Sequence, residues 1–382
     1  MIYLDNAATT PVCKAAADAA YAVMTENYGN PSSTHLAGRN AKKTLDTARK
    51  QVAMALGCEP GEVYFTACGT EADNWAILRG AEAMSKKGRH VISSTVEHDA
   101  VRRSLDELER RGYEVTRLRP DSTGAISVQA VKNALRADTI LVSLMMVNNE
   151  TGALTDISGI SRMLKDERSM ALLHTDAVQG FMKHPFKAST LGADMISISG
   201  HKIHAPKGIG ALYISKTMRP VSKLLPYILG GGQEAGMRAG TENLPGIAAF
   251  GAAAEEARKS LNSSIRRMNG LREHAVQRLT GEIEGVVIIG GGSPHILSVS
   301  MPGYPSEVVM SWLEKERGIC IAKSSACKKG GRSHVLEEIG LQPRVIDSAL
   351  RVSFSRLTTL EEVDSLCDGL VQAKQTLFPT LG

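Results

Sequence analysis

The chain lacks the features that mark secreted, membrane-spanning and nucleic-acid-binding proteins. Its six cysteines are scattered, with no C-x-x-C pair and no zinc-ribbon spacing, which favours reduced thiols over a disulfide framework. No apolar run reaches the roughly 18 residues that a membrane span requires, and the N-terminus has no basic leader region. No Lys-rich or Arg-rich run accompanies the mild net charge of +5, so nucleic acid is not expected as a direct partner. We therefore predict a cytoplasmic protein.

The length of 382 residues indicates more than one hydrophobic core. Hydrophobic residues make up 43% and charged residues 22% of the chain, as in an ordinary soluble protein. A chain this long exceeds a typical single core, so we expect one large and one smaller domain. We predict a large domain over 15–255, with 1–14 and 256–382 forming the small one.

Short apolar runs alternate with helical patterns between about residues 42 and 220. This alternation predicts βαβ units and a mostly parallel sheet, hence an α/β fold for the large domain. A Gly-rich segment at 230–234 then leads into a long helical pattern over 244–280, which we expect to bridge to a second, α+β unit. The expected strands are 63–66, 90–94, 114–118, 139–145, 171–174, 194–197 and 210–214, followed by 296–300, 319–321 and 349–354.

A lysine lies in the turn that follows one of these strands. The segment Ser199-Gly200-His201-Lys202 follows an apolar run and precedes another strand-like segment. A lysine on a glycine-containing turn, flanked by hydroxyl and imidazole groups, is typical of proteins that hold pyridoxal phosphate (PLP) as a Schiff base. Lys202 is therefore a candidate cofactor lysine.

A carboxylate at the end of another strand supports this interpretation. Asp176 follows the apolar run that begins at 171, and ligands of open α/β sheets bind beyond the carboxyl ends of strands. A carboxylate in that place keeps the ring nitrogen of PLP protonated, which makes the ring an electron sink.

Two further segments follow strands, and each also has an ordinary structural interpretation. Gly69 and Thr70 open a helix whose N-terminus could bind the cofactor phosphate, although Thr70 and Asp73 also fit a helix-capping pattern. His98 could stack on the ring and exchange protons with substrate, or it could be a surface histidine at a helix start.

A polar turn and a histidine pair complete the candidates near the cofactor. Asn149 could bond the ring oxygen or a substrate carboxylate, with Gln179 opposite it, or it could belong only to a polar turn. His201 and His204 form a His-x-x-His pair, but no matching carboxylate or cysteine pair accompanies them, so we expect no metal.

Cys327 differs from the other five cysteines in its neighbours. The segment Lys323-Ser324-Ser325-Ala326-Cys327-Lys328-Lys329 is small, polar and basic, and nearby cations favour a thiolate. Cys327 is therefore the candidate nucleophile, with an idle cysteine on a loop as the alternative.

These motifs together resemble a known family. The chain is similar to the PLP-dependent cysteine desulfurases of the iron–sulfur cluster assembly and nitrogen-fixation type, which are class V aminotransferases of PLP fold type I. The matching segments run in family order along nearly the whole chain. They are 3–11, 29–33, 69–71, 97–98, 147–150, 175–179, 199–202, 230–234, 237–241 and 324–327.

The resemblance implies a role for each matching residue. Lys202 would carry PLP, Asp176 would pair with the ring nitrogen and His98 would stack on the ring. Gln179 would contact the phenolic oxygen. The phosphate would be held at the helix start and lysine turn by Gly69, Thr70, Ser199 and His201, with Thr241 contributed by the other subunit of a homodimer.

The resemblance also implies the substrate and the reaction. Asn149 and Arg351 would bind the carboxylate of L-cysteine, as a fork-shaped guanidinium suits. The enzyme would release L-alanine and leave the sulfur as a persulfide on Cys327, for an acceptor such as an iron–sulfur scaffold or a tRNA-thiolation enzyme.

One segment departs from the family pattern, and two other functions stay open. The residues that follow Cys327 are basic and the loop is short, where the family often has small hydroxylated residues in a longer loop. Another class V enzyme, an aminotransferase or selenocysteine lyase, would need Lys202 and Asp176 without Cys327. A weakly active scaffold for sulfur-assembly partners would need none of the three.

Overall fold

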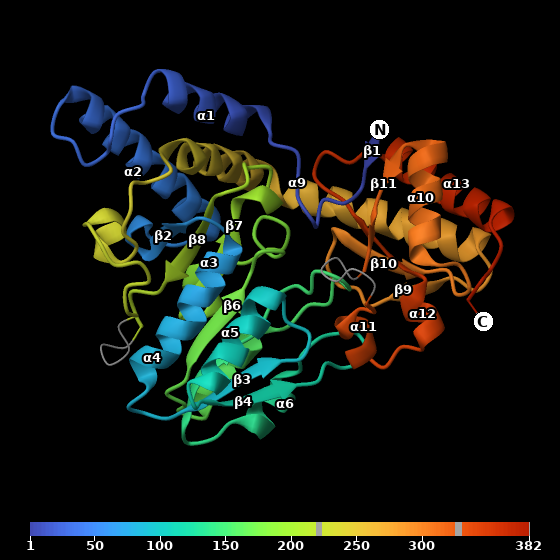
Figure 1. Cartoon of the computed structure of the whole chain (residues 1–382), viewed down its shortest axis with the longest axis horizontal. Coiled ribbons are helices and arrows are strands. Elements are labelled where there is room, and N and C mark those ends of the chain that lie inside the picture. The colour runs from blue at the N-terminus through green and yellow to red at the C-terminus, as the bar shows by residue number, and fades with distance from the viewer. Residues whose placement is uncertain (219–223, 325–330, 382) are drawn as a thin grey trace.

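A seven-stranded sheet forms the larger half of the molecule, in a computed structural model that describes residues 1–218, 224–324 and 331–381. The strand order is β2-β8-β7-β6-β5-β3-β4 (Figure 1). Only β8 runs antiparallel to its two neighbours, so the sheet is mostly parallel, as predicted. The strands are β2 (Val63–Thr66), β3 (His90–Ser94), β4 (Glu114–Leu118), β5 (Thr139–Ser143), β6 (Leu172–Asp176), β7 (Met195–Ser199) and β8 (Gly210–Ile214).

Helices cover both faces of this sheet, which explains why its central strands are buried throughout. Successive residues of a strand point to opposite faces, and in β6 Leu172 and Leu173 belong to different hydrophobic clusters. One cluster includes α3 (Gly69–Asn74) and α5 (Asp99–Arg110).

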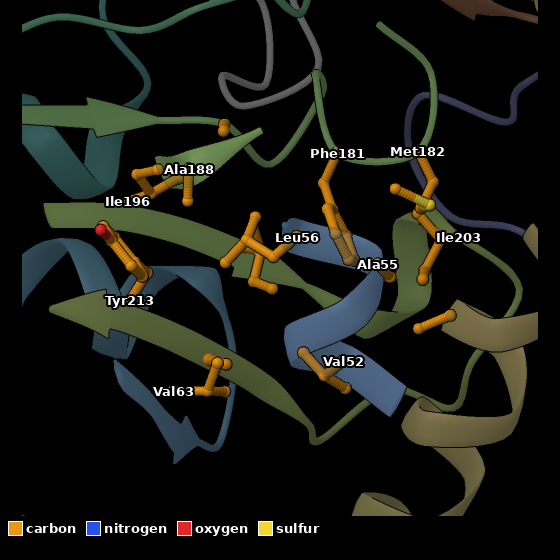
Figure 2. Packing of buried hydrophobic residues seen from close by; sticks show 14 of the residues in the cluster. Val52, Ala55, Leu56, Val63, Phe181, Met182, Ala188, Ile196, Ile203 and Tyr213 are labelled. Atoms are coloured by element: carbon orange, nitrogen blue, oxygen red, sulfur yellow. The ribbon is translucent and has the colours of Figure 1, made fainter. Parts of the chain in front are cut away.

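The opposite face of the sheet packs against α2 (Leu36–Leu56) and its neighbours. Figure 2 shows Val52 and Leu56 of α2 beside Val63, Ile196 and Tyr213 of the sheet. The remaining helices of this half are α1 (Lys14–Thr25), α4 (Gly80–Met84), α6 (Val128–Ala134), α7 (Ile157–Asp166) and α8 (Ala188–Leu191).

The smaller half is built on a four-stranded antiparallel sheet in the order β12-β13-β10-β9. A parallel pair, β1 and β11, joins the first residues of the chain to this half, where both chain ends lie (Figure 1). Its elements are β1 (Ile2–Tyr3), β9 (Val287–Ile289), β10 (Ile296–Ser300), α10 (Ser306–Arg317), β11 (Ile319–Cys320), β12 (Ala322–Lys323), α11 (His334–Glu338), α12 (Pro343–Asp347), β13 (Ala349–Ser353) and α13 (Leu360–Thr376).

One helix, α9 (Leu244–Glu282), connects the two halves. Its first turns bury Ile247 and Phe250 in the core of the large half, and its last turns bury Leu271 and Leu279 in the core of the small half. At 39 residues it is about 58 Å long. In the described part of the chain, no helix is both long and apolar enough to cross a membrane.

The predicted elements are present, and the largest differences lie at the carboxyl ends of strands. The pattern placed strand ends at 174 and 197, but β6 continues to Asp176 and β7 to Ser199. These polar residues pair in the sheet, Asp176 with Ser197 and Ser199 with Gly210, so the ladder extends past the apolar run. Strand β5 instead ends at Ser143, two residues before the predicted end.

Candidate active site

Most of the predicted site residues lie at the carboxyl ends of strands in the large sheet. Strands β2, β3, β5, β6 and β7 run in the same direction, so their carboxyl ends meet there. A predicted residue ends each of these strands or follows it. Polar side chains are tolerated there because they lie outside the packed middle of the sheet. These residues are Gly69 and Thr70, His98, Asn149, Asp176 and Ser199.

Asp176 is the last residue of β6 and is 7% exposed. Its Oδ1 accepts a hydrogen bond from the backbone N–H of Val178 at 2.9 Å. Burial raises the pKa of the Asp176 carboxyl, and the nearby His98 and Lys202, together with the Val178 bond, oppose that rise. A carboxylate that loses hydration and faces two basic side chains is suited to a cationic ring N–H.

Lys202 ends a short 3₁₀ turn, Gly200–Lys202, directly after β7. Its Nζ donates to the carbonyl oxygens of Ala7 at 2.6 Å and Ala8 at 2.7 Å. The same N-terminal segment holds the turn from the other side, because the Thr10 hydroxyl donates to the carbonyl oxygen of His201 at 2.9 Å. The N-terminal segment therefore forms one wall of the site, whereas the sequence analysis matched 3–11 to the family without giving it a role in the site.

The start of α3 lies beside the end of β7, in an arrangement suited to a phosphate. Ser199 is buried, and its Oγ has no hydrogen-bond partner among the described residues. Only glycine fits at position 69, since a Cβ there would lie 2.7 Å from Cγ2 of Val178 and 3.5 Å from Cβ of Ser199. An orphaned hydroxyl beside the first N–H groups of a helix fits an anionic oxygen.

The capping interpretation of Thr70 and Asp73 is wrong. Cys68 is the N-cap of α3 and makes no side-chain capping bond, while Thr70 is the exposed second residue of the helix. Asp73 is 1% exposed, and its Oδ1 has no hydrogen-bond partner within the described residues. Burial raises the pKa of Asp73 well above its ordinary value, with the neighbouring Asp176 adding to the rise.

The two histidines of the predicted site are fixed by different neighbours. His98 is the half-buried N-cap of α5, and its Nδ1 accepts from the backbone N–H of Ala100 at 3.1 Å. The Nδ1 of His201 lies 3.1 Å from Oγ1 of Thr9. Burial lowers the pKa of His201 to about 4, and Lys202 adds to the shift, so this imidazole is neutral near pH 7.

The second histidine of the His-x-x-His pair has a structural role. The Nδ1 of His204 lies 2.9 Å from the carbonyl oxygen of Pro11, and burial lowers the pKa of His204 to about 4. Within residues 1–218, 224–324 and 331–381, no three His, Cys, Asp or Glu side chains are grouped as a metal site would require.

Arg351 reaches the site from β13 in the small half and is 2% exposed. One terminal nitrogen donates to the carbonyl oxygen of Asn149 at 3.0 Å, and the other pairs with Oδ1 of Asp5 at 2.9 Å. Its Nε is buried with no hydrogen-bond partner in the described chain. The guanidinium thus has an unused donor, which suits a substrate carboxylate. Asp5 is a further residue that sequence reasoning missed.

Neighbouring residues of the 148–150 turn have separate tasks. The Asn148 side chain shapes the turn, because its Oδ1 accepts from the N–H groups of Glu150 and Thr151 at 2.9 and 3.0 Å. Asn149 is half-buried and contributes the carbonyl oxygen that Arg351 binds. Burial raises the pKa of Glu150 to about 7, and its carboxylate accepts a hydrogen bond from Ser333 of the small half.

Gln179 lies one turn beyond Asp176 and is 5% exposed. Its Nε2 donates to the carbonyl oxygen of Ala7 at 2.8 Å, so it shares this acceptor with Lys202. Two buried side chains, Lys183 and His295, lie at its Oε1, and the sequence offered no reason to group them with it.

No contact among the described residues links the last two predicted residues to the site. Thr241 is exposed in the segment that leads into α9. Cys327, the predicted nucleophile, falls outside the described residues.

Comparisons with known proteins agree with this arrangement. The family model described as Aminotransferase class-V matches residues 2–366. Cysteine desulfurase 2 of Trichormus variabilis is 42% identical over 371 residues, covering 96% of this chain and 91% of the relative. The cysteine desulfurase IscS of Methanosarcina thermophila is 39% identical, covering 98% and 92%. The chain belongs to the class V aminotransferases, among the cysteine desulfurases.

Solved structures place this cysteine desulfurase family member in the predicted fold. A structure titled NIFS-LIKE PROTEIN superposes with a TM-score of 0.91 at 34% identity, covering 98% of this chain and all of that one. Another, titled SspA in complex with cysteine, superposes with a TM-score of 0.80 at 31% identity, covering 94% and 100%. The predicted PLP fold type I is confirmed, and the chain is a PLP-dependent enzyme.

Proposed function

We propose that this enzyme converts L-cysteine to L-alanine and transfers the sulfur, as a persulfide on Cys327, to an acceptor protein. The observation that carries the proposal is that three ionisable side chains approach one site from separate elements, which are the turn after β7, the end of β6 and the middle of β13. Lys202 opposes the rise in the pKa of the Asp176 carboxyl, and Arg351 enters from the small half with a buried Nε that no described residue binds. These are the groups that a PLP enzyme acting on an amino acid needs.

Each side chain has one task in the proposed reaction. Bound PLP supplies the electron sink for charge that develops at the substrate Cα. Arg351 and Asn149 bind the substrate carboxylate, and the Lys202 amine takes the proton from Cα. With PLP bound, Asp176 would hold a proton on the ring nitrogen, and His98 would stack on the ring and exchange protons with the substrate.

Sulfur transfer is the task of Cys327. Its thiolate attacks the substrate sulfur, an S–S bond forms, and the Cβ–S bond breaks with its electron pair going to the carbon skeleton. That skeleton takes up a proton at Cβ, regains the Cα proton from the Lys202 amine and leaves as alanine. The sequence around Cys327, with Lys323, Lys328 and Lys329, supports a thiolate there.

The phosphate site includes a residue of a second subunit in our proposal. Ser199, His201, Gly69 and Thr70 bind the phosphate from one subunit, and Thr241 of a homodimer partner completes the shell. The exposure of Thr241 in this chain supports its use across an interface.

The proposal extends to domain organisation and cellular context. We propose that 15–255 act as the PLP-binding domain and that 1–14 and 256–382 act as the domain that presents Cys327. We also propose a cytoplasmic location, supported by the five described cysteines all being free thiols, and a sulfur acceptor in iron–sulfur cluster assembly or tRNA thiolation.

The test is a comparison of the wild-type enzyme with Cys327→Ser. With L-cysteine, the wild type should release alanine and gain one sulfur atom on the peptide containing Cys327, detected by mass spectrometry. The serine variant should bind cysteine normally but release alanine at least about a thousandfold more slowly, because a hydroxyl is a far weaker nucleophile than a thiolate. Cys320→Ser serves as the matched control. Full activity of Cys327→Ser would favour a lyase or aminotransferase.

A further inference from the structure

Lys183 is an uncommon residue to find inside the molecule. It is 6% exposed, lies four residues after Gln179, and its Nζ donates to the Oε1 of that glutamine at 3.2 Å. Burial lowers the pKa of Lys183 well below its ordinary value, and the nearby cations Lys202 and Arg351 lower it further. A buried lysine costs stability, so a function that offsets this cost is expected, and its contacts indicate which one.

His295 approaches the same oxygen from the small half of the molecule. Its Nε2 lies 3.2 Å from Oε1 of Gln179, and its ring is fully buried. Burial lowers the pKa of His295 well below its ordinary value, with Lys183 the first of several cations that add to the shift. The ring is therefore neutral, with one nitrogen protonated. Its Nδ1 has no hydrogen-bond partner among the described residues.

The amide orientation of Gln179 follows from its third contact. The carbonyl oxygen of Ala7 can only accept, so the nitrogen Nε2, 2.8 Å away, must face it. Oε1 therefore faces Lys183 and His295, and the proton of His295 must sit on Nε2 to donate to it. A reversed amide would place Oε1 against a carbonyl oxygen, which is repulsive.

We propose that Lys183 and His295 are positioning residues that hold the Gln179 amide so that its remaining N–H is presented to the ring oxygen of PLP. This inference rests on the proposed function, in which Gln179 contacts that oxygen. Two donors at 3.2 Å on one amide oxygen, and one acceptor at 2.8 Å on the amide nitrogen, leave the side chain a single orientation. Without the two donors, Oε1 would be buried and unpaired, and the amide could rotate.

The proposal predicts a spectroscopic effect that a merely structural role would not produce. A hydrogen bond to the ring oxygen stabilises its anionic form, so it lowers the pH at which the bound cofactor gives up its proton and changes colour. Loss of the positioning contacts weakens this bond. The midpoint of the colour change should then rise by about one pH unit, a tenfold change in the proton equilibrium.

The experiment uses the PLP-loaded protein and its absorption spectrum as a function of pH. Lys183→Met removes one donor and His295→Leu removes the other, and both variants should raise the midpoint. His295→Asn keeps a donor of similar reach and should stay near the wild type. Lys187→Met is the matched control, because it makes the same change at an exposed lysine four residues further on, and its midpoint should not move.

A double-mutant cycle decides whether the effect acts through Gln179. In a Gln179→Leu background the midpoint is already raised, and Lys183→Met should move it no further. Equal shifts in both backgrounds would overturn the proposal, as would unchanged midpoints in Lys183→Met and His295→Leu. If Lys183→Met does not fold, the His295→Leu and His295→Asn pair tests the same oxygen.

One added measurement separates this inference from the proposed function. Borohydride reduction followed by peptide mapping should find PLP on Lys202 in the wild type and in every variant of this set. Attachment at Lys202 with unmoved midpoints would overturn the positioning role and leave the proposed function standing. Attachment at Lys183 in the wild type would overturn both.

Discussion

Two regions of the molecule are rich in charged groups and handle them in opposite ways. At the carboxyl edge of the large sheet, Asp176, Asp73 and Lys183 are buried, and desolvation is the largest cause of the shift in each pKa. On the surface of the small half, Arg278 pairs with Glu282 and with two aspartates of α13, and these pairs are partly exposed.

The difference shows that the two regions serve different purposes. The bond to Arg278 lowers the pKa of Glu282, which keeps that pair in its ordinary charged state. Burial favours the neutral forms of Asp176, Asp73 and Lys183. A buried ion that stays charged costs several kcal/mol of stability. Exposed pairs change stability by about 0–1 kcal/mol. Ionisable groups are thus retained at the carboxyl ends of the strands at the expense of stability, which indicates function.

The largest expected effect is at the cofactor lysine. Lys202→Ala removes the only amine that we assign to PLP attachment, so activity should fall by about ten thousandfold or more and the yellow colour should be lost on dialysis. Borohydride reduction and peptide mapping check the assignment, with Lys187→Ala as the exposed control. Covalent PLP mapped to Lys183 in Lys202→Ala would show that the attachment site was assigned to the wrong lysine.

Asp176→Asn should have the next largest effect. The amide keeps the shape of the side chain but cannot hold a proton on the ring nitrogen, so turnover should fall about a thousandfold while PLP still binds. Turnover and a PLP titration check this. Near-normal turnover in this variant would remove Asp176 from its assigned role.

Glu97 is another buried carboxyl, and it makes the stability of the fold depend on pH. It is 1% exposed, accepts from the Ser94 hydroxyl at 2.6 Å and the Met145 N–H at 2.9 Å, and burial raises its pKa to about 8. Because the folded pKa lies above the unfolded value, its contribution to stability is complete below about pH 4.5 and is lost as pH rises toward 8.

Glu97→Gln should remove this part of the pH dependence. Between pH 5 and 7.5 the wild type should lose about 3 kcal/mol more stability than the variant, measured as free energy of unfolding in urea. Glu26→Gln, an exposed carboxyl, serves as the control. Parallel stability curves for wild type and Glu97→Gln would show that Glu97 is not desolvated as described.

The smallest expected effect is at the exposed cluster. Arg278→Ala removes bonds to Glu282, Asp364 and Asp368 at 2.7–3.0 Å but should cost no more than about 1 kcal/mol, and less at high salt. PLP content and turnover should be unchanged. Thermal unfolding at low and high salt provides the measurement. A loss of cofactor in Arg278→Ala would contradict the contrast between the two regions.

The sequence predicted the elements of the fold and most of the site, because short sequence patterns indicate both. Apolar runs indicated the strands, and polar residues at their ends indicated Asp176, His98 and Asn149. Strand β6 ends at the carboxylate of Asp176, as its sequence indicated, but the bounds drawn from the apolar runs stopped short of Asp176 and Ser199, because pairing with neighbouring strands, not hydrophobicity, extends the ladder there.

Contacts between distant segments could not be predicted in the same way. The bonds from Lys202 to Ala7 and from His295 to Gln179 join residues that are more than a hundred positions apart. No local pattern carries such a pairing. Nothing in the sequence distinguishes a buried lysine from an exposed one, so Lys183 gave no signal beyond its place four residues after Gln179.

The N-terminal wall of the site has a consequence for how the protein is made. Ile2 pairs with Ile319, and Asp5 binds Arg351, so these two residues depend on partners synthesised more than three hundred residues later. At roughly 5–20 residues per second, Ile2 and Asp5 wait tens of seconds for these partners. The site around Lys202 is therefore not complete until Arg351 has been synthesised, and loading of the cofactor into the complete site comes after that point.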